Sequence, residues 1–158
     1  MKKILLVAVL LSVAFISCKK EKDKPEPKSQ AAKEEELIKA YLTEKNISAK
    51  KDAASGLYYY IEAPGTGMRP SSLSRVTVNY KSEALTTGKE ISSGTNVNFW
   101  LPDTITGWKI GLPLICKGGK IVLFAPSDLA FKNGYVGIVP ANTVVIFYIE
   151  LLDVTTPE

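Results

Sequence analysis

The pattern of apolar and polar side chains changes twice along this chain, and each change marks a different kind of segment. An apolar run extends from Ile4 to Ile16 with Ser12 as its one polar residue. Residues 19–30 then carry alternating charges and no apolar side chain except two prolines. From residue 31 onward, helical spacing and later strand alternation predict a folded region.

The first folded element predicted is a helix over residues 31–47. Three successive acids, Glu34 to Glu36, lie near its N-terminal end, where the helix dipole favours negative charge. Asn46 lies near its expected end. Apolar residues recur at helical spacing at Leu37, Ile38, Tyr41 and Leu42. This short stripe favours packing against the helix's own domain, and dimerisation through the helix is the alternative.

After Gly56 the sequence predicts an antiparallel sheet. Strand patterns cover residues 57–63, 75–85, 97–101, 121–125 and 143–154. The last of these places Val145, Phe147, Ile149 and Leu151 on one face. Residues 105–115 are apolar but contain two glycines and a proline, so only a short helix fits there. The predicted fold class is α+β, with an antiparallel sheet wrapped around one short central helix and preceded by an N-terminal helix.

Composition narrows the chemistry. The 46% hydrophobic and 23% charged fractions are ordinary for a globular domain. The formal charge of +4 falls to +2 without Lys2 and Lys3, which gives no reason to expect nucleic acid binding. The absence of histidine excludes histidine-based triads, bases and metal ligands, and we expect no cofactor and no metal. Of the two cysteines, Cys18 and Cys116, the second is expected to be a small core residue.

The N-terminus is typical of an export signal. Two lysines precede an apolar run that is too short to span a bilayer comfortably, so residues 1–17 are predicted to be a signal peptide. The Ser17–Cys18 step resembles the lipobox of bacterial lipoproteins, although Phe15 is bulkier than the usual leucine. We expect a lipid on Cys18, a charged disordered spacer over residues 18–30, and anchoring to the bacterial outer membrane on its periplasmic or external side. The alternatives are a signal anchor, or an ordinary cleaved peptide with a chance cysteine.

Ordered motifs between Gly56 and Val154 resemble the FKBP-type peptidyl-prolyl cis-trans isomerases. They are residues 78–80 (VNY), 88–93 (GKEISS), 104–108 (TITGW), 118–120 (GGK), 126–131 (PSDLAF), 137–142 (GIVPAN) and 145–152 (VIFYIELL). The resemblance implies an FKBP-like domain, placed at residues 51–158 after a helical segment at 31–50. It further implies an isomerase that acts on proline-containing polypeptides, assists the folding of exported proteins and is open to a macrolide that mimics proline.

The resemblance also implies an apolar cup that receives proline. Trp108 matches its floor, Tyr80 and Phe147 match two walls, and the backbone N–H of Ile105 matches the group that holds a substrate carbonyl. The implied catalytic residues are Tyr80, Trp108, Phe147, Phe131 and Ile105. The implied substrate-binding residues are Ile91, Ser92, Val97, Phe99, Thr104, Ile138 and Val139.

Four positions depart from the family pattern. Ile91 and Val97 stand where the family has aromatic walls. Ser92 stands where it has an aspartate, and Phe131 replaces a tyrosine. The chain between Phe131 and Gly137 is also shortened. These departures predict a wider, less aromatic and less polar cup.

The reaction suits such a cup. Rotation about the peptide bond has a barrier of roughly 18–20 kcal/mol because resonance holds the amide planar. A water-poor pocket that favours the twisted amide lowers this barrier without a nucleophile or proton carrier. The four departures leave a second hypothesis open, a catalytically weak or inactive binding or chaperone module of the same fold. We expect a monomer, with the helix-mediated dimer as the alternative.

Overall fold

The computed structural model describes residues 28–132 and 139–156. The predicted signal peptide, Cys18, most of the spacer and Ile138 lie outside these residues. Within them, no helix is long and apolar enough to cross a membrane.

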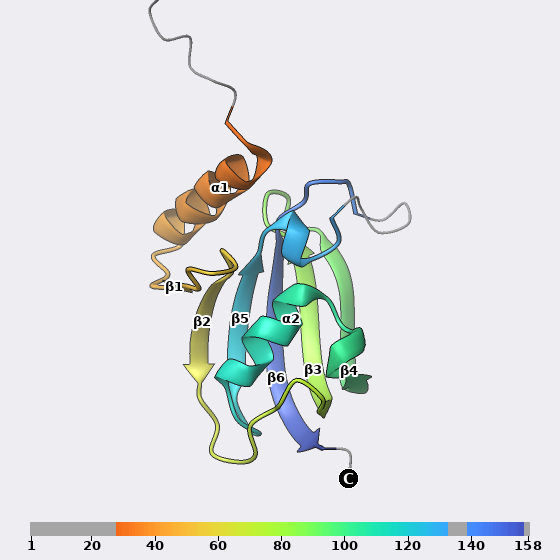
Figure 1. The fold of residues 1–158 in the computed structure, drawn as a ribbon. Coiled ribbons are helices and arrows are strands. Elements are labelled where there is room, and N and C mark those ends of the chain that lie inside the picture. Colours follow the sequence, from red (N-terminus) through yellow and green to blue (C-terminus); the bar gives the residue numbers. More distant parts are fainter. Residues whose placement is uncertain (1–27, 133–138, 157–158) are drawn as a thin grey trace, which may run out of the picture.

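The described residues form one antiparallel sheet of six strands in the order β1-β2-β5-β6-β3-β4 (Figure 1). The strands are β1 (Lys50–Lys51), β2 (Tyr58–Ala63), β3 (Arg75–Ala84), β4 (Glu90–Trp100), β5 (Lys120–Ala125) and β6 (Val145–Thr155). A short helix, α2 (Thr106–Gly111), crosses one face of the sheet. Short 3-10 turns, η1 (Leu101–Asp103) and η2 (Leu112–Leu114), flank it. The predicted α+β architecture is therefore confirmed.

Strand β4 begins earlier than the pattern predicted, at Glu90 instead of residue 97. It is an edge strand, and most of its first seven residues are exposed, so they show no apolar alternation. A bulge further obscures the pattern, because Asn96 adopts a left-handed conformation with φ of 55° and the register with β3 shifts there. The short predicted strand is thus the C-terminal part of a longer one.

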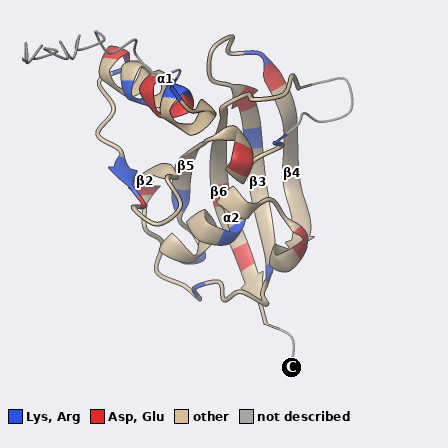
Figure 2. Cartoon of the chain, turned by 45° about the horizontal axis from the view of Figure 1, so that its top comes forward, with Lys and Arg blue, Asp and Glu red and all other residues tan. Residues whose placement is uncertain are grey.

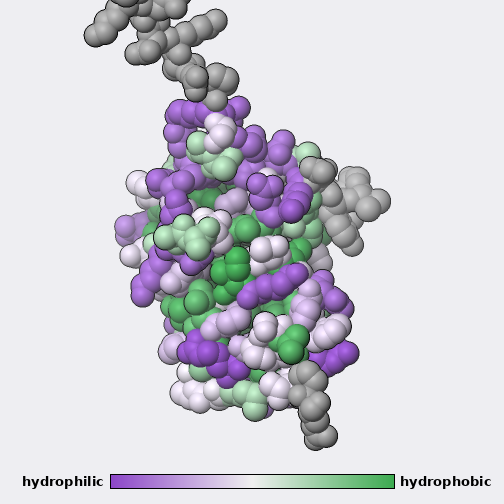
Figure 3. Space-filling model, viewed as in Figure 1, coloured by the Kyte–Doolittle hydropathy of each residue, from purple (hydrophilic) through white to green (hydrophobic). Residues whose placement is uncertain are grey.

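Successive apolar side chains of β5 and β6 point to opposite faces of the sheet, so the interior consists of two cores. Val145, Phe147, Ile149 and Leu151 face α2, as predicted, with Leu123 of β5 beside them. The intervening Ile146 of β6, with Val122 and Phe124 of β5, faces the opposite side. Apolar residues gather at the centre of the face that carries α2 (Figure 3).

The opposite side of the sheet is covered by α1 (Gln30–Glu44). Ser29 caps its first turn, and Asn46 follows its end in a left-handed conformation with φ of 53°. The helix therefore begins one residue earlier than predicted, at Gln30, and ends three residues earlier than predicted, at Glu44. It packs against its own domain, because Ile38 and Leu42 are buried in the core with Phe124.

Two further expectations are corrected here. Glu34, Glu35 and Glu36 lie beyond the first turn of α1, which contains no acid, so the helix dipole does not account for them. Charged residues are instead distributed along α1 (Figure 2).

Cys116 is half-buried and is not one of the core side chains. It lies in the turn between η2 and β5, where its N–H donates to the Pro64 carbonyl and its carbonyl accepts from the N–H of Gly119.

Candidate functional site

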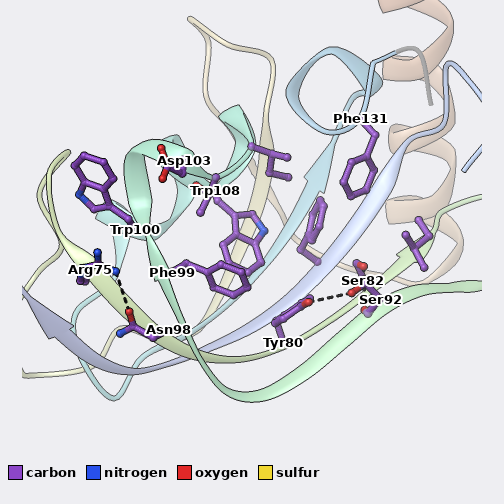
Figure 4. Close-up of a pocket in the computed structure, with 14 residues that line it drawn as sticks. Arg75, Tyr80, Ser82, Ser92, Asn98, Phe99, Trp100, Asp103, Trp108 and Phe131 are labelled. Carbon is purple, nitrogen blue, oxygen red and sulfur yellow. Dashed lines mark hydrogen bonds between the residues drawn. The ribbon is translucent and has the colours of Figure 1, made fainter. Parts of the chain in front are cut away.

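A cavity of about 570 Å³ opens between α2 and the β3–β4 end of the sheet (Figure 4). It brings together nine residues that the sequence pointed to, and their roles stay predictions. They are Tyr80, Ile91, Ser92, Phe99, Thr104, Ile105, Trp108, Phe131 and Phe147. The chain thus gathers side chains from β3, β4, α2, β6 and the segment after β5.

Trp108 forms the base of the cavity and is 4% exposed. Its ring lies 5.3 Å from that of Tyr80 and 5.3 Å from that of Phe99, measured between centroids, with interplanar angles of 80° and 87°. Phe147 meets the same ring at 6.0 Å and 84°. Edge-to-face packing of this kind gives each ring a fixed direction, so the base and walls are rigid.

The short helix holds Trp108 in place through its neighbours. Gly107 lies close to the backbone of Leu129, because an added Cβ would come within 3.1 Å of the Leu129 carbonyl oxygen. Gly111 allows a still closer approach, because a Cβ added there would lie 2.6 Å from a methyl carbon of Leu123. The indole Nε1–H of Trp108 is buried without a partner among the described residues, which costs about 1–3 kcal/mol. This side chain is therefore placed for the ring surface that it offers.

The start of α2 leaves the backbone N–H of Ile105 available as a donor. Both the N–H and the hydroxyl of Thr104 donate to the Leu101 carbonyl, at 3.1 and 2.8 Å. The carbonyl of Ile105 accepts from Trp108 and Lys109. Within the described residues the N–H of Ile105 itself has no hydrogen-bond partner. A bound carbonyl group could satisfy it at the mouth of the cavity.

Polar contacts in the cup centre on Ser92. Its hydroxyl lies 2.9 Å from the Tyr80 hydroxyl, and its carbonyl accepts from the Ser82 hydroxyl at 3.0 Å. The sequence suggested only that a carboxylate is lost at this position. The shorter serine nevertheless keeps Tyr80 hydrogen-bonded and adds no charge to the cavity.

Val97 and Val139 are not among the residues that line the cavity, and their predicted part in substrate binding stays a prediction. Val97 follows the bulge at Asn96 and lies beside Gly94, where an added Cβ would be 2.7 Å from the valine Cγ2. Phe99, two residues later, supplies the wall. Val139 is 5% exposed and is not among the lining residues.

The cavity has a second, more polar part that the sequence did not indicate. Trp100 is 41% exposed and donates its indole N–H to the Leu73 carbonyl at 3.3 Å. Arg75 and Asn98 are hydrogen-bonded at 3.4 Å across the paired strands. With Asp103 these residues continue the cavity beyond Phe99 (Figure 4). The pairing of Arg75 with Trp100 across β3 and β4 could have been inferred only with the correct register.

The described residues contain no cluster of three acidic or cysteine side chains that could hold a metal ion. Among the described residues that line the cavity, the charged ones are Arg75 and Asp103 at its outer end. The inner cup therefore presents ring surfaces, hydroxyl groups and the backbone N–H of Ile105.

Comparisons with known proteins agree with this geometry. The family model described as FKBP-type peptidyl-prolyl cis-trans isomerase matches residues 67–152. The chain is 42% identical over 127 residues to the FKBP-type peptidyl-prolyl cis-trans isomerase FkpA of Buchnera aphidicola, covering 76% of this chain and 52% of the relative. The FkpA of Escherichia coli K12 is 38% identical over 127 residues, covering 78% and 46%. The chain thus spans about half the length of these relatives.

Solved structures give the same result. The crystal structure of FkpA from Escherichia coli matches with a TM-score of 0.70 and 36% identity, covering 80% of this chain and 60% of that one. A peptidyl-prolyl cis-trans isomerase of Pseudomonas syringae matches with a TM-score of 0.68 and 26% identity, covering 82% and 99%.

Proposed function

Because the chain belongs to the FKBP-type peptidyl-prolyl cis-trans isomerase family, we propose that it is a prolyl isomerase that assists the folding of exported proteins in the bacterial cell envelope. The observation that carries this proposal is the packing of three aromatic rings edge to face on Trp108. Beside them lies the N–H of Ile105, which has no hydrogen-bond partner among the described residues. The activity, substrates and partners of this chain are part of the proposal.

The chemistry follows from what the cup offers. Proline packs on the Trp108 ring between Tyr80, Phe99 and Phe147, which removes its amide from water. The amide loses resonance and dipole as it twists, so the apolar surroundings destabilise the planar form more than the twisted one. The Ile105 N–H holds the carbonyl before proline in the twisted geometry. No proton transfer is required, which is consistent with the absence of histidine.

An isomerisation assay on an X–Pro peptide tests this proposal. The full chain accelerates isomerisation, and Trp108→Leu lowers kcat/KM by at least about tenfold because the floor is lost. Tyr60→Leu is the control, since Tyr60 is 41% exposed on β2 and lies outside the cavity. An uncatalysed rate with the wild-type chain, together with peptide binding, would instead indicate a non-catalytic binding or chaperone module.

We propose in addition that residues 1–17 are a signal peptide and that Cys18 carries the lipid, with residues 18–30 as a spacer before the helical segment and the FKBP-like domain. The apolar run of residues 4–16, the Ser17–Cys18 step and the charged residues that follow support this proposal. Cys18→Ser should release the protein from the membrane fraction and abolish incorporation of labelled fatty acid. Cys116→Ser is the matched control, and equal behaviour of the two variants would contradict the anchor.

The ligands and assembly follow the same reasoning. Proline-containing polypeptides are the proposed clients, and a proline-mimicking macrolide is a proposed competitor for the cup. We propose a monomer, because Ile38 and Leu42 of α1 are already buried against their own sheet. Light scattering of the purified chain should give one chain per particle, and a two-chain mass would support the helix-mediated dimer.

A further inference from the structure

A buried carboxylate connects α1 to the cup. Glu34 is 2% exposed, although it lies in a helix whose other acids are accessible. Its Oε2 accepts from the backbone N–H of Ser127 at 2.9 Å, and its Oε1 accepts from the Ser127 hydroxyl at 2.7 Å. Gln30 donates to the same carboxylate at 2.7 Å. Among the described residues, no lysine or arginine pairs with it.

Ser127 is the first residue of a turn that ends two residues before Phe131. This turn, η3 (Ser127–Leu129), follows β5. The Ser127 carbonyl accepts from the N–H of Ala130 at 3.1 Å and from that of Lys132 at 2.7 Å. Both peptide neighbours of Phe131 are therefore bonded to the residue that Glu34 holds. Phe131 in turn lies 6.2 Å from Phe147 and lines the cavity.

Docking of the helix alone does not require Glu34. Glu35, the next residue, already binds β1 and β2 from a more exposed position, accepting from Lys51 at 2.8 Å and from the Tyr58 hydroxyl at 3.0 Å. Ile38 and Leu42 supply the apolar contact. A carboxylate buried without a counter-charge is costly, and an apolar residue of similar size would dock the helix at less cost. What the carboxylate adds is direction, because two charge-assisted hydrogen bonds fix one backbone segment.

We propose that Glu34 is a positioning residue for the cup: through Ser127 it sets the place of Phe131, so that docking of α1 tunes the binding of proline-containing peptides. This inference rests on the proposed function for its consequence in peptide binding. Its structural half, the control of Phe131 by Glu34, is independent of any activity.

The test compares Glu34→Ala with Glu35→Ala in the full chain, labelled with fluorophenylalanine. The chain contains five phenylalanines, and Phe131→Leu assigns the Phe131 signal by its loss. Glu34→Ala should shift or broaden that ¹⁹F resonance and weaken binding of an X–Pro peptide by about three- to tenfold, as expected for losing one or two directed hydrogen bonds. Glu35→Ala should lower the melting temperature and leave both the Phe131 resonance and the peptide Kd unchanged.

Two further variants separate positioning from general destabilisation. Glu34→Gln keeps an oxygen for the Ser127 N–H, so it should restore much of the wild-type Phe131 resonance. Ser127→Ala removes the hydroxyl bond alone and should give a smaller shift than Glu34→Ala. An unchanged Phe131 resonance in Glu34→Ala, or an equal change in Glu35→Ala, overturns the inference. If the wild-type chain shows no isomerase activity, the ¹⁹F comparison still decides between these outcomes.

Discussion

The two faces of the sheet use similar apolar material for different purposes. On the face under α1, Ile38 and Phe124 are fully buried in a continuous contact between helix and sheet. On the face under α2, aromatic rings meet edge to face around an open cavity. Among the described residues, the indole N–H of Trp108 and the backbone N–H of Ile105 have no hydrogen-bond partner there. The first face stabilises the domain, and the second leaves ring surface open to a cavity, which is the surface proposed to receive proline.

The largest effect expected from this comparison is on stability at the α1 face. Ile38→Ala removes a side chain with no exposed surface and leaves a cavity, so it should lower the free energy of unfolding by about 2–5 kcal/mol. Leu37→Ala, next to it and 43% exposed, should change it by less than about 0.5 kcal/mol. Urea unfolding of both variants measures this, and equal losses would show that α1 is not docked as described.

The next effect concerns how closely α2 approaches the sheet. In Gly111→Ala the new Cβ would lie 2.6 Å from a methyl carbon of Leu123, so overpacking should cost about 1–3 kcal/mol. The exposed Lys109→Ala in the same helix is the control. A thermal melt with no difference between the two variants would mean that α2 has room to move, and the cup floor would then not be rigid.

A hydroxyl on each face distinguishes the two roles more finely. Tyr80→Phe removes the bond to Ser92 in the cup, and Tyr58→Phe removes the bond to Glu35 beside α1. Each loses one hydrogen bond, worth about 0.5–1.5 kcal/mol. Only Tyr80→Phe should weaken peptide binding, by up to about tenfold, as measured by isothermal titration. Weaker binding in Tyr58→Phe would remove the distinction between the faces.

The smallest effect is a pH dependence at the α1 face. Hydrogen bonds from Lys39, Lys51 and Tyr58 lower the pKa of Glu35 from its ordinary 4.5 to about 2. Because the folded state holds the ionised form, the contribution of Glu35 to stability is full above pH 4.5 and is lost as the pH falls toward about 2. Glu35→Gln should therefore flatten the acid decline of the urea midpoint. A decline as steep as that of the wild type would contradict these bonds.

The sequence predicts these two faces unequally. The alternation in β6 identifies both sides of the central strand because it depends on local spacing, and the resemblance of residues 104–108 to the family motif locates Trp108. The apolar pattern did not reveal the bulge at Asn96, and the strand was therefore predicted to begin at residue 97 instead of Glu90. Glu34 could not be distinguished from Glu35, since burial of one acid in a run of three depends on which neighbour reaches Ser127 in the folded chain. Which of these acids is buried depends on a contact between residues far apart in the sequence, so local patterns do not predict it.

Under the proposed function the cup catalyses rotation of the amide whose carbonyl the Ile105 N–H holds, and the backbone of Ile105 allows a direct test. Its φ of −64° and the extended conformation of Thr104 both suit a proline at position 105. Ile105→Pro therefore removes the N–H without forcing the fold, and Ile105→Ala controls for the lost side chain.

NMR exchange spectroscopy on an X–Pro peptide measures the cis–trans interconversion rate with catalytic amounts of each protein. We predict acceleration by the wild type and by Ile105→Ala, and a rate at least about tenfold lower with Ile105→Pro. A wild-type rate equal to that in buffer, or a fully active Ile105→Pro variant with an unchanged melting temperature, would contradict the account.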